Sequence, residues 1–386
     1  MKNTFKKFAI VALSCMMVFA LASCGGGSAF SDDTLNIGGI GPVTGPAALY
    51  GQAVENGAKL AVDEINAANP DGLQIAWEMQ DDEHDPEKSV NAYNTLVDEG
   101  MQVLVGTVTS APCTAVSAEA KANRTFALTP SASATSVVEG NDNVFQLCFQ
   151  DPQQGQIAAE YIMKNFPDAT VGAIYNNSDN YSTGILDAFE KALKEKGKKV
   201  EKEAFASDDN ADFSAQLNKM KNANVDLLFL PIYYTPASNI MKQAHDMGYA
   251  PKYFGCDGLD GILALEGFDT SFAEGALLLT PFSADAEDEA TKAFVAAYQE
   301  AYGEKPIQFA ADAYDCVYAV YNCFKATGLE PDAAMADVCE AMIKQFNGGF
   351  TATGLTATGE MKWQPTGEVE KAPKIYLIQD GKYVEQ

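Results

Sequence analysis

The chain has 386 residues, and its 53 aspartate and glutamate residues outnumber its 26 lysine and arginine residues, which gives a net charge of −27 at pH 7. This acidity argues against a nucleic-acid-binding protein, because phosphate groups are bound by clustered lysine and arginine side chains. The hydrophobic share of 47% is typical of a globular protein rather than a disordered one, and the length suggests about two domains.

The first 23 residues have the pattern of a secretory signal peptide. Three lysines precede the apolar run Phe8–Ala22, which is shorter than the ~20 residues that a transmembrane helix needs. The run ends in Leu21-Ala22-Ser23-Cys24, which resembles the lipobox of bacterial lipoproteins, whose cysteine is acylated and becomes the new N-terminus. We therefore expect an exported protein that is anchored to the outer face of the cell membrane through a lipid on Cys24, with residues 24–33 as a flexible tether.

Apolar runs typical of strands alternate with helical patterns through most of the remaining chain. Leu35–Ile40 is the first predicted strand, and from Ala53 small and apolar residues recur on one face of a helix. Leu73–Met79 is the next strand, and Asp85-Pro86 begins a helix, because aspartate caps a helix N-terminus and proline fits its first turn. Further strands, each followed by a helical stretch, are predicted at Val103–Val105, Phe126–Leu128, Val171–Tyr175 and Leu227–Leu230.

This alternating order predicts an α/β fold in which parallel sheets carry helices on both faces. In such sheets the loops beyond the carboxyl ends of the strands converge and bind ligands. The C-terminal part differs, because glycines divide it into short β-prone segments that end in Ile375–Ile378. We interpret that part as extended structure that packs on the body of the protein.

Cysteine and histidine offer little support for metal or redox chemistry. Outside the signal peptide and Cys24, the cysteines are Cys113, Cys148, Cys256, Cys316, Cys323 and Cys339. None belongs to a CxxC pair, which argues against a redox pair or a zinc knuckle, and we expect mostly free, buried thiols. The two histidines, His84 and His245, are predicted to lie at the surface, so neither a metal nor a cofactor is expected.

Residues Gly41–Gly51 read GPVTGPAALYG, and this segment resembles the N-terminal signature of the branched-chain amino-acid (Leu/Ile/Val)-binding proteins of ABC importers. The resemblance continues in order through Asp81-Asp82, Thr129–Ser133 and the turn at Asp257-Gly258, so it covers almost the whole mature chain. It implies a type I periplasmic-binding-protein fold, with two doubly wound parallel-sheet lobes joined by a three-strand hinge and the ligand in the cleft between them.

The resemblance also implies that each lobe is discontinuous in the sequence. The chain is expected to cross between the lobes near Cys148–Gln150, Thr280–Pro281 and Phe350–Gly354. The expected organisation is a signal peptide at 1–23, a lipid-anchored tether at 24–33, a first lobe at 34–147 plus 282–350, and a second lobe at 148–281 plus 351–386.

A free amino acid in such a cleft requires donors for its carboxylate and acceptors for its ammonium group. Ser110 stands between the strand Val103–Val105 and a helix, where backbone N–H groups and a hydroxyl can bind the carboxylate. Asp257, on a turn after a strand, can pair with the ammonium group, because an unpaired charge in a closed cleft is costly. Ser133 can offer its hydroxyl to the ammonium group and its N–H to the carboxylate.

The resemblance implies the same assignments for the charged groups. Ser110 corresponds to the carboxylate-binding serine of the family, and Ala132 and Ser133 correspond to an Ala-Thr pair that binds both charged groups, with serine in place of threonine. Asp257 corresponds to the acid that pairs with the ammonium group, where the best-known members have glutamate.

Aromatic residues complete the site that the resemblance implies. Tyr181 and Tyr233 correspond to the two tyrosines that the second lobe brings over the ligand. Tyr50 and Phe309 correspond to aromatic residues that line the side-chain pocket, and Asp312 near Phe309 suggests a pocket that is not wholly apolar.

The sequence therefore predicts the extracytoplasmic solute-binding component of an ABC transporter. It is expected to capture a small amino acid, with a branched-chain amino acid favoured, and to deliver it to the permease subunits in the membrane. One alternative is the same fold with an amide, a urea-like compound or an aromatic acid as ligand. The other is an exported lipoprotein enzyme, against which the chain has no G-x-S-x-G, Walker or HExxH motif.

Overall fold

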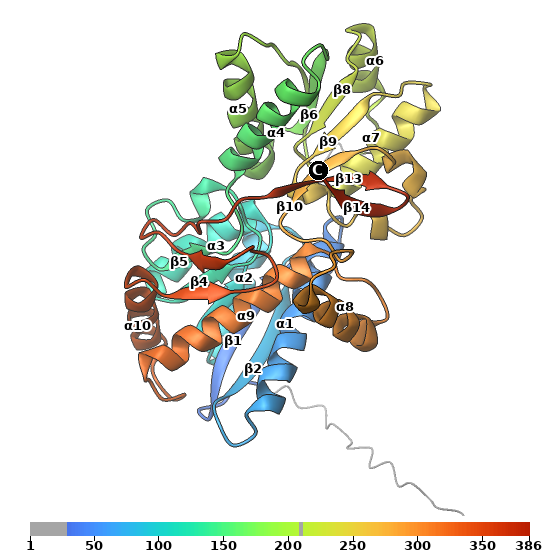
Figure 1. Ribbon diagram of the computed structural model, residues 1–386. Coiled ribbons are helices and arrows are strands. Elements are labelled where there is room, and N and C mark those ends of the chain that lie inside the picture. The colour runs from blue at the N-terminus through green and yellow to red at the C-terminus, as the bar shows by residue number, and fades with distance from the viewer. Residues whose placement is uncertain (1–28, 208–210) are drawn as a thin grey trace, which may run out of the picture.

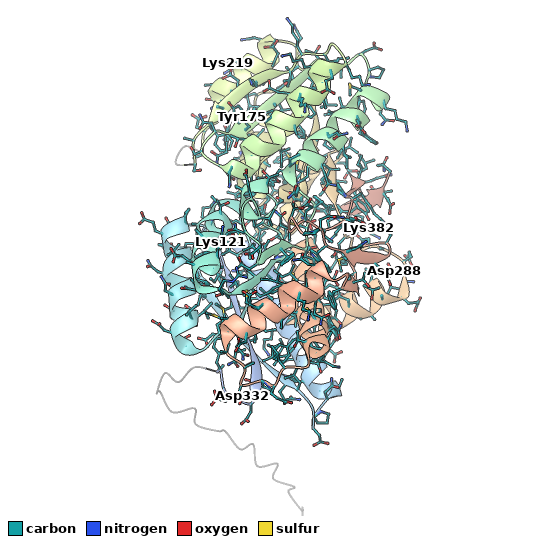
Figure 2. The ribbon with its side chains drawn as sticks, turned by 90° about the vertical axis from the view of Figure 1, so that its left-hand side faces the viewer. Lys121, Tyr175, Lys219, Asp288, Asp332 and Lys382 are labelled. Atoms are coloured by element: carbon teal, nitrogen blue, oxygen red, sulfur yellow. The ribbon has the colours of Figure 1, made fainter. Side chains whose placement is uncertain are left out.

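The computed structural model describes residues 29–207 and 211–386, and it consists of two lobes, each built on its own sheet (Figure 1). The predicted signal peptide, Cys24 and most of the tether lie outside the described residues. Within the described residues, no helix is long and apolar enough to cross a membrane. Figure 2 shows the side chains of both lobes, with Tyr175 and Lys219 on the second lobe and Lys121 on the first.

The sheet of the first lobe is wholly parallel. Its strands follow the order β2-β1-β3-β4-β5, and they are β1 (Thr34–Gly41), β2 (Gln74–Asp81), β3 (Val103–Gly106), β4 (Phe126–Thr129) and β5 (Val144–Gln146). The connecting helices are α1 (Ala48–Ala68), α2 (Pro86–Glu99) and α3 (Ser110–Asn123). The central strands β3 and β4 are buried along their whole length, which is why they read as continuous apolar runs.

The sheet of the second lobe is parallel except at one edge. Its order is β14-β13-β10-β9-β8-β6-β7, and its strands are β6 (Val171–Asn176), β7 (Glu201–Phe205), β8 (Leu227–Leu230), β9 (Lys252–Gly255), β10 (Leu277–Thr280), β13 (Lys374–Gln379) and β14 (Lys382–Glu385). The last two run antiparallel. Its helices are α4 (Asp151–Asn165), α5 (Asn180–Glu195), α6 (Ser214–Asn222) and α7 (Tyr234–Asp246), and they cover both faces of the sheet (Figure 1). The predicted two-lobe α/β fold is confirmed.

Three later helices return to the first lobe, which is therefore discontinuous in the sequence. They are α8 (Glu289–Tyr302), α9 (Gln308–Thr327) and α10 (Met335–Asn347). The longest of them, α9, packs along α1 (Figure 1). The contact is close enough that a methyl group on Gly57 would lie 2.1 Å from the carbonyl oxygen of Ala310, so glycine is required there.

The third crossing between the lobes lies later in the chain than the predicted Phe350–Gly354. The hairpin of β11 (Thr351–Thr353) and β12 (Glu360–Lys362) stays with the first lobe, where Trp363 stacks near Phe346 and donates to the carbonyl of Gln146 at 2.8 Å. The chain reaches the second lobe only at β13. The predicted second lobe of 148–281 plus 351–386 therefore includes the β11–β12 hairpin wrongly. A resemblance in sequence order says little about where a glycine-rich segment packs.

A buried ion pair fastens this third crossing. Lys371, only 7% exposed, donates from Nζ to Asp312 Oδ1 at 3.2 Å, to Thr356 Oγ1 at 2.6 Å and to the carbonyl of Leu147 at 3.3 Å. Burial raises the pKa of Asp312, and the Lys371 ammonium opposes this rise. The Asp312 carboxylate, which the sequence placed near the side-chain pocket, thus pairs with Lys371 at the end of β5.

The cysteines within the described residues are buried, and none of them forms a disulfide. They are Cys113, Cys148, Cys256, Cys316, Cys323 and Cys339. Their depth in the two lobes explains their presence as packing residues, because a free thiol behaves as a small hydrophobic group.

Replacing Lys371 with Met should lower the free energy of unfolding by about 3–5 kcal/mol, because it leaves Asp312 buried without its counter-charge. Denaturant unfolding of the ligand-free protein measures the effect. Lys374→Met is the matched control, because Lys374 pairs with Glu385 at the surface and its loss should cost about 1 kcal/mol or less. Equal effects of the two substitutions would contradict the structural importance of the buried pair.

Candidate functional site

Loops from both lobes meet around one small cavity. The lining residues follow the carboxyl ends of β1, β3 and β4 in the first lobe and of β6, β8 and β9 in the second, together with the start of α9. They are Tyr50, Val108, Thr109, Ser110, Ser131, Tyr181, Tyr233, Asp257, Gly258 and Phe309. Larger surface cavities exist elsewhere, but this one contains most of the residues that the sequence predicted as ligand-binding.

Ser110 begins α3 and is almost fully buried. Its Oγ accepts hydrogen bonds from the N–H groups of Ser133 and Ala134, each at 3.2 Å, which joins the loops after β3 and β4. The first turn of α3 adds N–H groups that have no acceptor within the helix. The positive end of the helix dipole and these donors make this side of the cavity suited to an anion.

The loop after β4 presents Ser131 rather than Ala132 to the cavity. Thr129 Oγ1 accepts the N–H of Ala132 at 3.0 Å, and Gln146 Nε2 donates to the carbonyl of Ala132 at 2.8 Å. Ala132 is thereby turned away from the cavity and fully buried. Ser133 is also fully buried, and its hydroxyl makes no hydrogen bond of standard geometry within the described residues.

Asp257, which follows β9, is 4% exposed and carries an unusual set of partners. Its Oδ1 accepts hydrogen bonds from Tyr181 Oη at 2.7 Å, from Gln154 Nε2 at 2.9 Å and from the N–H of Gly258 at 2.8 Å. Burial raises the pKa of Asp257 to about 6, and these three donors lower it. The carboxylate is therefore oriented by neutral donors, and no lysine or arginine of the described residues pairs with it.

Two further buried carboxyl groups lie near Asp257. Asp151 begins α4 and Asp179 caps α5, and burial raises the pKa of both, that of Asp179 to about 6. Among the described residues, Lys371 is the one buried lysine or arginine, and it pairs with Asp312. The side of the cavity formed by the second lobe is thus negative and suited to a cationic group.

Aromatic rings form the rest of the wall. The rings of Tyr50 and Phe309 stack with centroids 4.2 Å apart, those of Tyr181 and Tyr233 with centroids 4.9 Å apart, and Tyr50 meets Tyr233 edge-on at 5.4 Å. Such a wall favours an apolar group, because aromatic rings bury large areas.

The two lobes touch across the cavity. Tyr50 of the first lobe donates its hydroxyl to the carbonyl of Gly258 in the second. Beside this contact, Thr235 Oγ1 donates to the carbonyl of Pro46 at 2.7 Å, and Asn180 Nδ2 donates to Ser136 Oγ at 3.0 Å. The structure is therefore a closed form, in which the cavity is enclosed between the lobes.

His84 lies beside the cavity, where it contacts two of the lining residues, and the sequence interpretation missed this position. It is half-buried rather than at the surface, its Nδ1 lies 2.8 Å from Thr109 Oγ1, and its ring meets that of Tyr233 edge-on at 5.4 Å. Its backbone has a φ of 63° in the acidic loop after β2, and that turn directs it to the cleft. No spacing pattern marks such a residue, because a left-handed turn is a feature of the loop backbone.

The predicted site residues thus fall into two groups. The structure brings together Tyr50, Ser110, Tyr181, Tyr233, Asp257 and Phe309 on the cavity wall. Ala132 and Ser133 lie behind that wall, and Ser131 and Thr109, which were not predicted, lie on it. No group of three or more His, Cys, Asp or Glu side chains suited to a metal ion occurs within 29–207 and 211–386.

Comparisons with known proteins agree with this fold and identify its family. A family model described as Periplasmic binding protein matches residues 34–368. The Leu/Ile/Val-binding protein BraC3 of Rhizobium johnstonii is 32% identical over 355 residues, covering 91% of this chain and 93% of the relative. The substrate-binding protein LivJ of Streptococcus pneumoniae, solved in complex with isoleucine, is 30% identical over 92% of this chain and 100% of that chain, with a TM-score of 0.80. The leucine-binding protein LivK of Thermotoga maritima is 26% identical over 92% and 98%, also with a TM-score of 0.80.

Asp257→Asn should stabilise the ligand-free protein at neutral and alkaline pH. A carboxyl group whose pKa is raised on folding lowers stability once the pH exceeds that raised pKa, and the penalty disappears below the unfolded value near 4. The variant should therefore gain stability at pH 8 and none at pH 4, and about 3 kcal/mol is the limit for a protein that stays closed without its ligand. Unfolding measured across that range, with the exposed Asp187→Asn as control, checks this, and a gain that is independent of pH would contradict it.

Proposed function

Because the chain belongs to the periplasmic binding protein family, we propose that it is the extracytoplasmic solute-binding component of an ABC transporter and that its ligand is a small, branched-chain amino acid. The proposal rests on one observation: the cavity has hydrogen-bond donors at one end, from Ser110 and the start of α3, and the carboxylate of Asp257 at the other. A zwitterion fits this arrangement.

The carboxylate of the ligand would bind at Ser110. Ser110 Oγ already accepts two backbone N–H groups, so its own hydroxyl hydrogen is available to donate to an anion. The N–H groups of the first turn of α3 add to this interaction without a buried cation, and charge-assisted hydrogen bonds of this kind are stronger than neutral ones.

The ammonium group would bind at Asp257. Tyr181, Gln154 and Gly258 all donate to Oδ1, and Oδ2 accepts no hydrogen bond within the described residues. An acidic end of this kind opposes a ligand that has only a carboxylate, which disfavours the aromatic-acid alternative.

The side chain of the ligand would lie against Tyr50, Phe309 and Val108. These aromatic and aliphatic side chains suit an apolar ligand group. Because the wall comes from both lobes, binding and closure are coupled, and the hinge moves the lobes apart to release the ligand unchanged to the permease. Neither step requires a catalytic group, in keeping with relatives that are solute-binding proteins.

Calorimetric titration tests the ligand class and the role of Asp257 together. Leucine, isoleucine and valine should bind to the wild type, and Asp257→Asn should weaken each by about 2–5 kcal/mol, or about 30- to several-thousand-fold in Kd. Most of the loss should appear as faster release, since the contact forms on closure. Asp187→Asn on the outer face of α5 is the control and should bind as the wild type does.

Two results would count against this proposal in different ways. If Asp257→Asn binds the amino acids with wild-type affinity, Asp257 does not bind the ammonium group, but the ligand is still an amino acid. If the wild type gives no binding heat with any amino acid but does so with an amide, a urea-like compound or benzoate, the ligand belongs to that other class.

Membrane attachment through Cys24 is part of the proposal. Leu21-Ala22-Ser23-Cys24 supports it, because an acyl chain provides membrane affinity to a protein that must stay near its permease. Cys24→Ala should move the protein from the membrane fraction to the soluble fraction, whereas Cys15→Ala in the apolar run should leave it attached. Detergent-dependent partitioning that persists in Cys24→Ala would overturn the anchor.

A further inference from the structure

Helix α9 of the first lobe begins at a contact with the second lobe. Its first residue, Gln308, follows Ile307, whose apolar side chain cannot accept the N–H groups that the start of a helix leaves unpaired. Asp260, in the loop after β9 of the second lobe, takes that role, because its Oδ2 accepts the N–H of Gln308 at 2.7 Å. The cap of this helix is therefore supplied by the other lobe.

The side chain of Gln308 belongs to the same contact. Its Nε2 donates to the carbonyl of Asp257 at 2.9 Å, and its Oε1 accepts from Thr280 Oγ1, at the end of β10, at 2.8 Å. Together with the N–H, these hydrogen bonds run from one buried residue of the first lobe to three residues of the second. Gln308 thus joins the two lobes with both its backbone and its side chain.

The Asp260 carboxylate divides its two oxygens between the lobes. Oδ1 accepts the hydroxyl of Tyr383 at 2.8 Å and the N–H of Gly261 at 2.9 Å, and both of these donors belong to the second lobe. Oδ2 accepts from the first lobe, where the positive end of the α9 dipole also favours a carboxylate. When the lobes move apart, the partners of Oδ1 move with Asp260, whereas the contact of Oδ2 is lost.

This contact lies next to the cavity without being part of its wall. The lining residues include Asp257, Gly258 and Phe309, which are close in sequence to the contact, but neither Asp260 nor Gln308 is among the described residues that line the cavity. The pair can therefore stabilise the closed form without contacting a ligand.

We propose that Asp260 is a positioning residue that holds the lobes closed by capping α9 at Gln308, and that this contact slows the release of any ligand that the cavity admits. The inference rests on the lobe closure of the proposed function but not on the identity of the ligand. An interaction that exists only in the closed form raises the population of that form, so it lowers the Kd of every ligand by the same factor.

The first test removes a single N–H group. Gln308→Pro and Gln308→Ala both delete the side chain, but only the proline also deletes the N–H that Asp260 accepts. Proline suits the first position of a helix, and Ile307 before it is already extended, with a φ of −96° and a ψ of 171°. Relative to Gln308→Ala, the Kd values of leucine and valine should both rise about 3- to 30-fold, mainly through faster release.

The second test removes the acceptor and has a matched control. Asp288 caps α8 by accepting the N–H of Thr291 at 2.9 Å, and both of these residues belong to the first lobe. Asp260→Ala should weaken binding by about threefold or more, whereas Asp288→Ala should leave the Kd within about twofold. In the Asp260→Ala background, Gln308→Pro should bind no more weakly than Gln308→Ala, because the acceptor is gone. Thermal unfolding of the ligand-free variants verifies that each is folded.

The results separate this inference from the proposed function. Equal Kd values for Gln308→Pro and Gln308→Ala, or a factor that differs between leucine and valine, would overturn the interlobe cap and leave the proposed function standing. If the wild type binds benzoate or an amide instead of an amino acid, the proposed ligand class is wrong, and the same factor is then expected for that compound. A wild type that binds none of these compounds would overturn the proposed function and the inference together.

Discussion

The site depends on a carboxylate that is buried without a counter-charge. Asp257 lies within the closed cleft, where three neutral donors hold one of its oxygens and two other buried carboxyl groups, Asp151 and Asp179, lie nearby. Removing such a charge from water is costly unless a cation replaces the lost hydration. Under the proposed function, the ammonium group of the ligand supplies that cation, which would link ligand binding to closure.

The third crossing between the lobes also contains a buried charge, but there the counter-charge belongs to the protein. Lys371 and Asp312 form a buried pair whose partners are all supplied by the chain itself, and they fasten the third crossing to the end of β5. One buried charge is thus neutralised within the protein and the other is not. The charge near the third crossing is thus balanced by the chain itself, whereas under the proposed function the charge at the cavity is balanced by the ligand.

The strands, the helices and the positions of Ser110 and Asp257 at the ends of strands could be predicted from the sequence, because they depend on local patterns. Strand runs, the N-cap at Asp85 and residues that directly follow strands, such as Ser110 and Asp257, have positions that the β-α order determines. What the sequence could not indicate depends on long-range contacts. Ser131 replaces Ala132 on the wall because Gln146 turns the Ala132 carbonyl away, and His84 enters the cleft through a left-handed turn. The late third crossing likewise follows from the packing of Trp363 on the first lobe.

Under the proposed function, the charged ends of the cavity provide affinity and its apolar wall provides selectivity. Every α-amino acid carries the same carboxylate and ammonium group, so Ser110 and Asp257 contribute equally to all of them and cannot distinguish one from another. Discrimination must arise at the wall that meets the side chain, where Tyr50, Phe309 and Val108 favour apolar groups. Under the proposed function, the breadth of the ligand range therefore depends on these wall residues rather than on the two charged ends of the cavity.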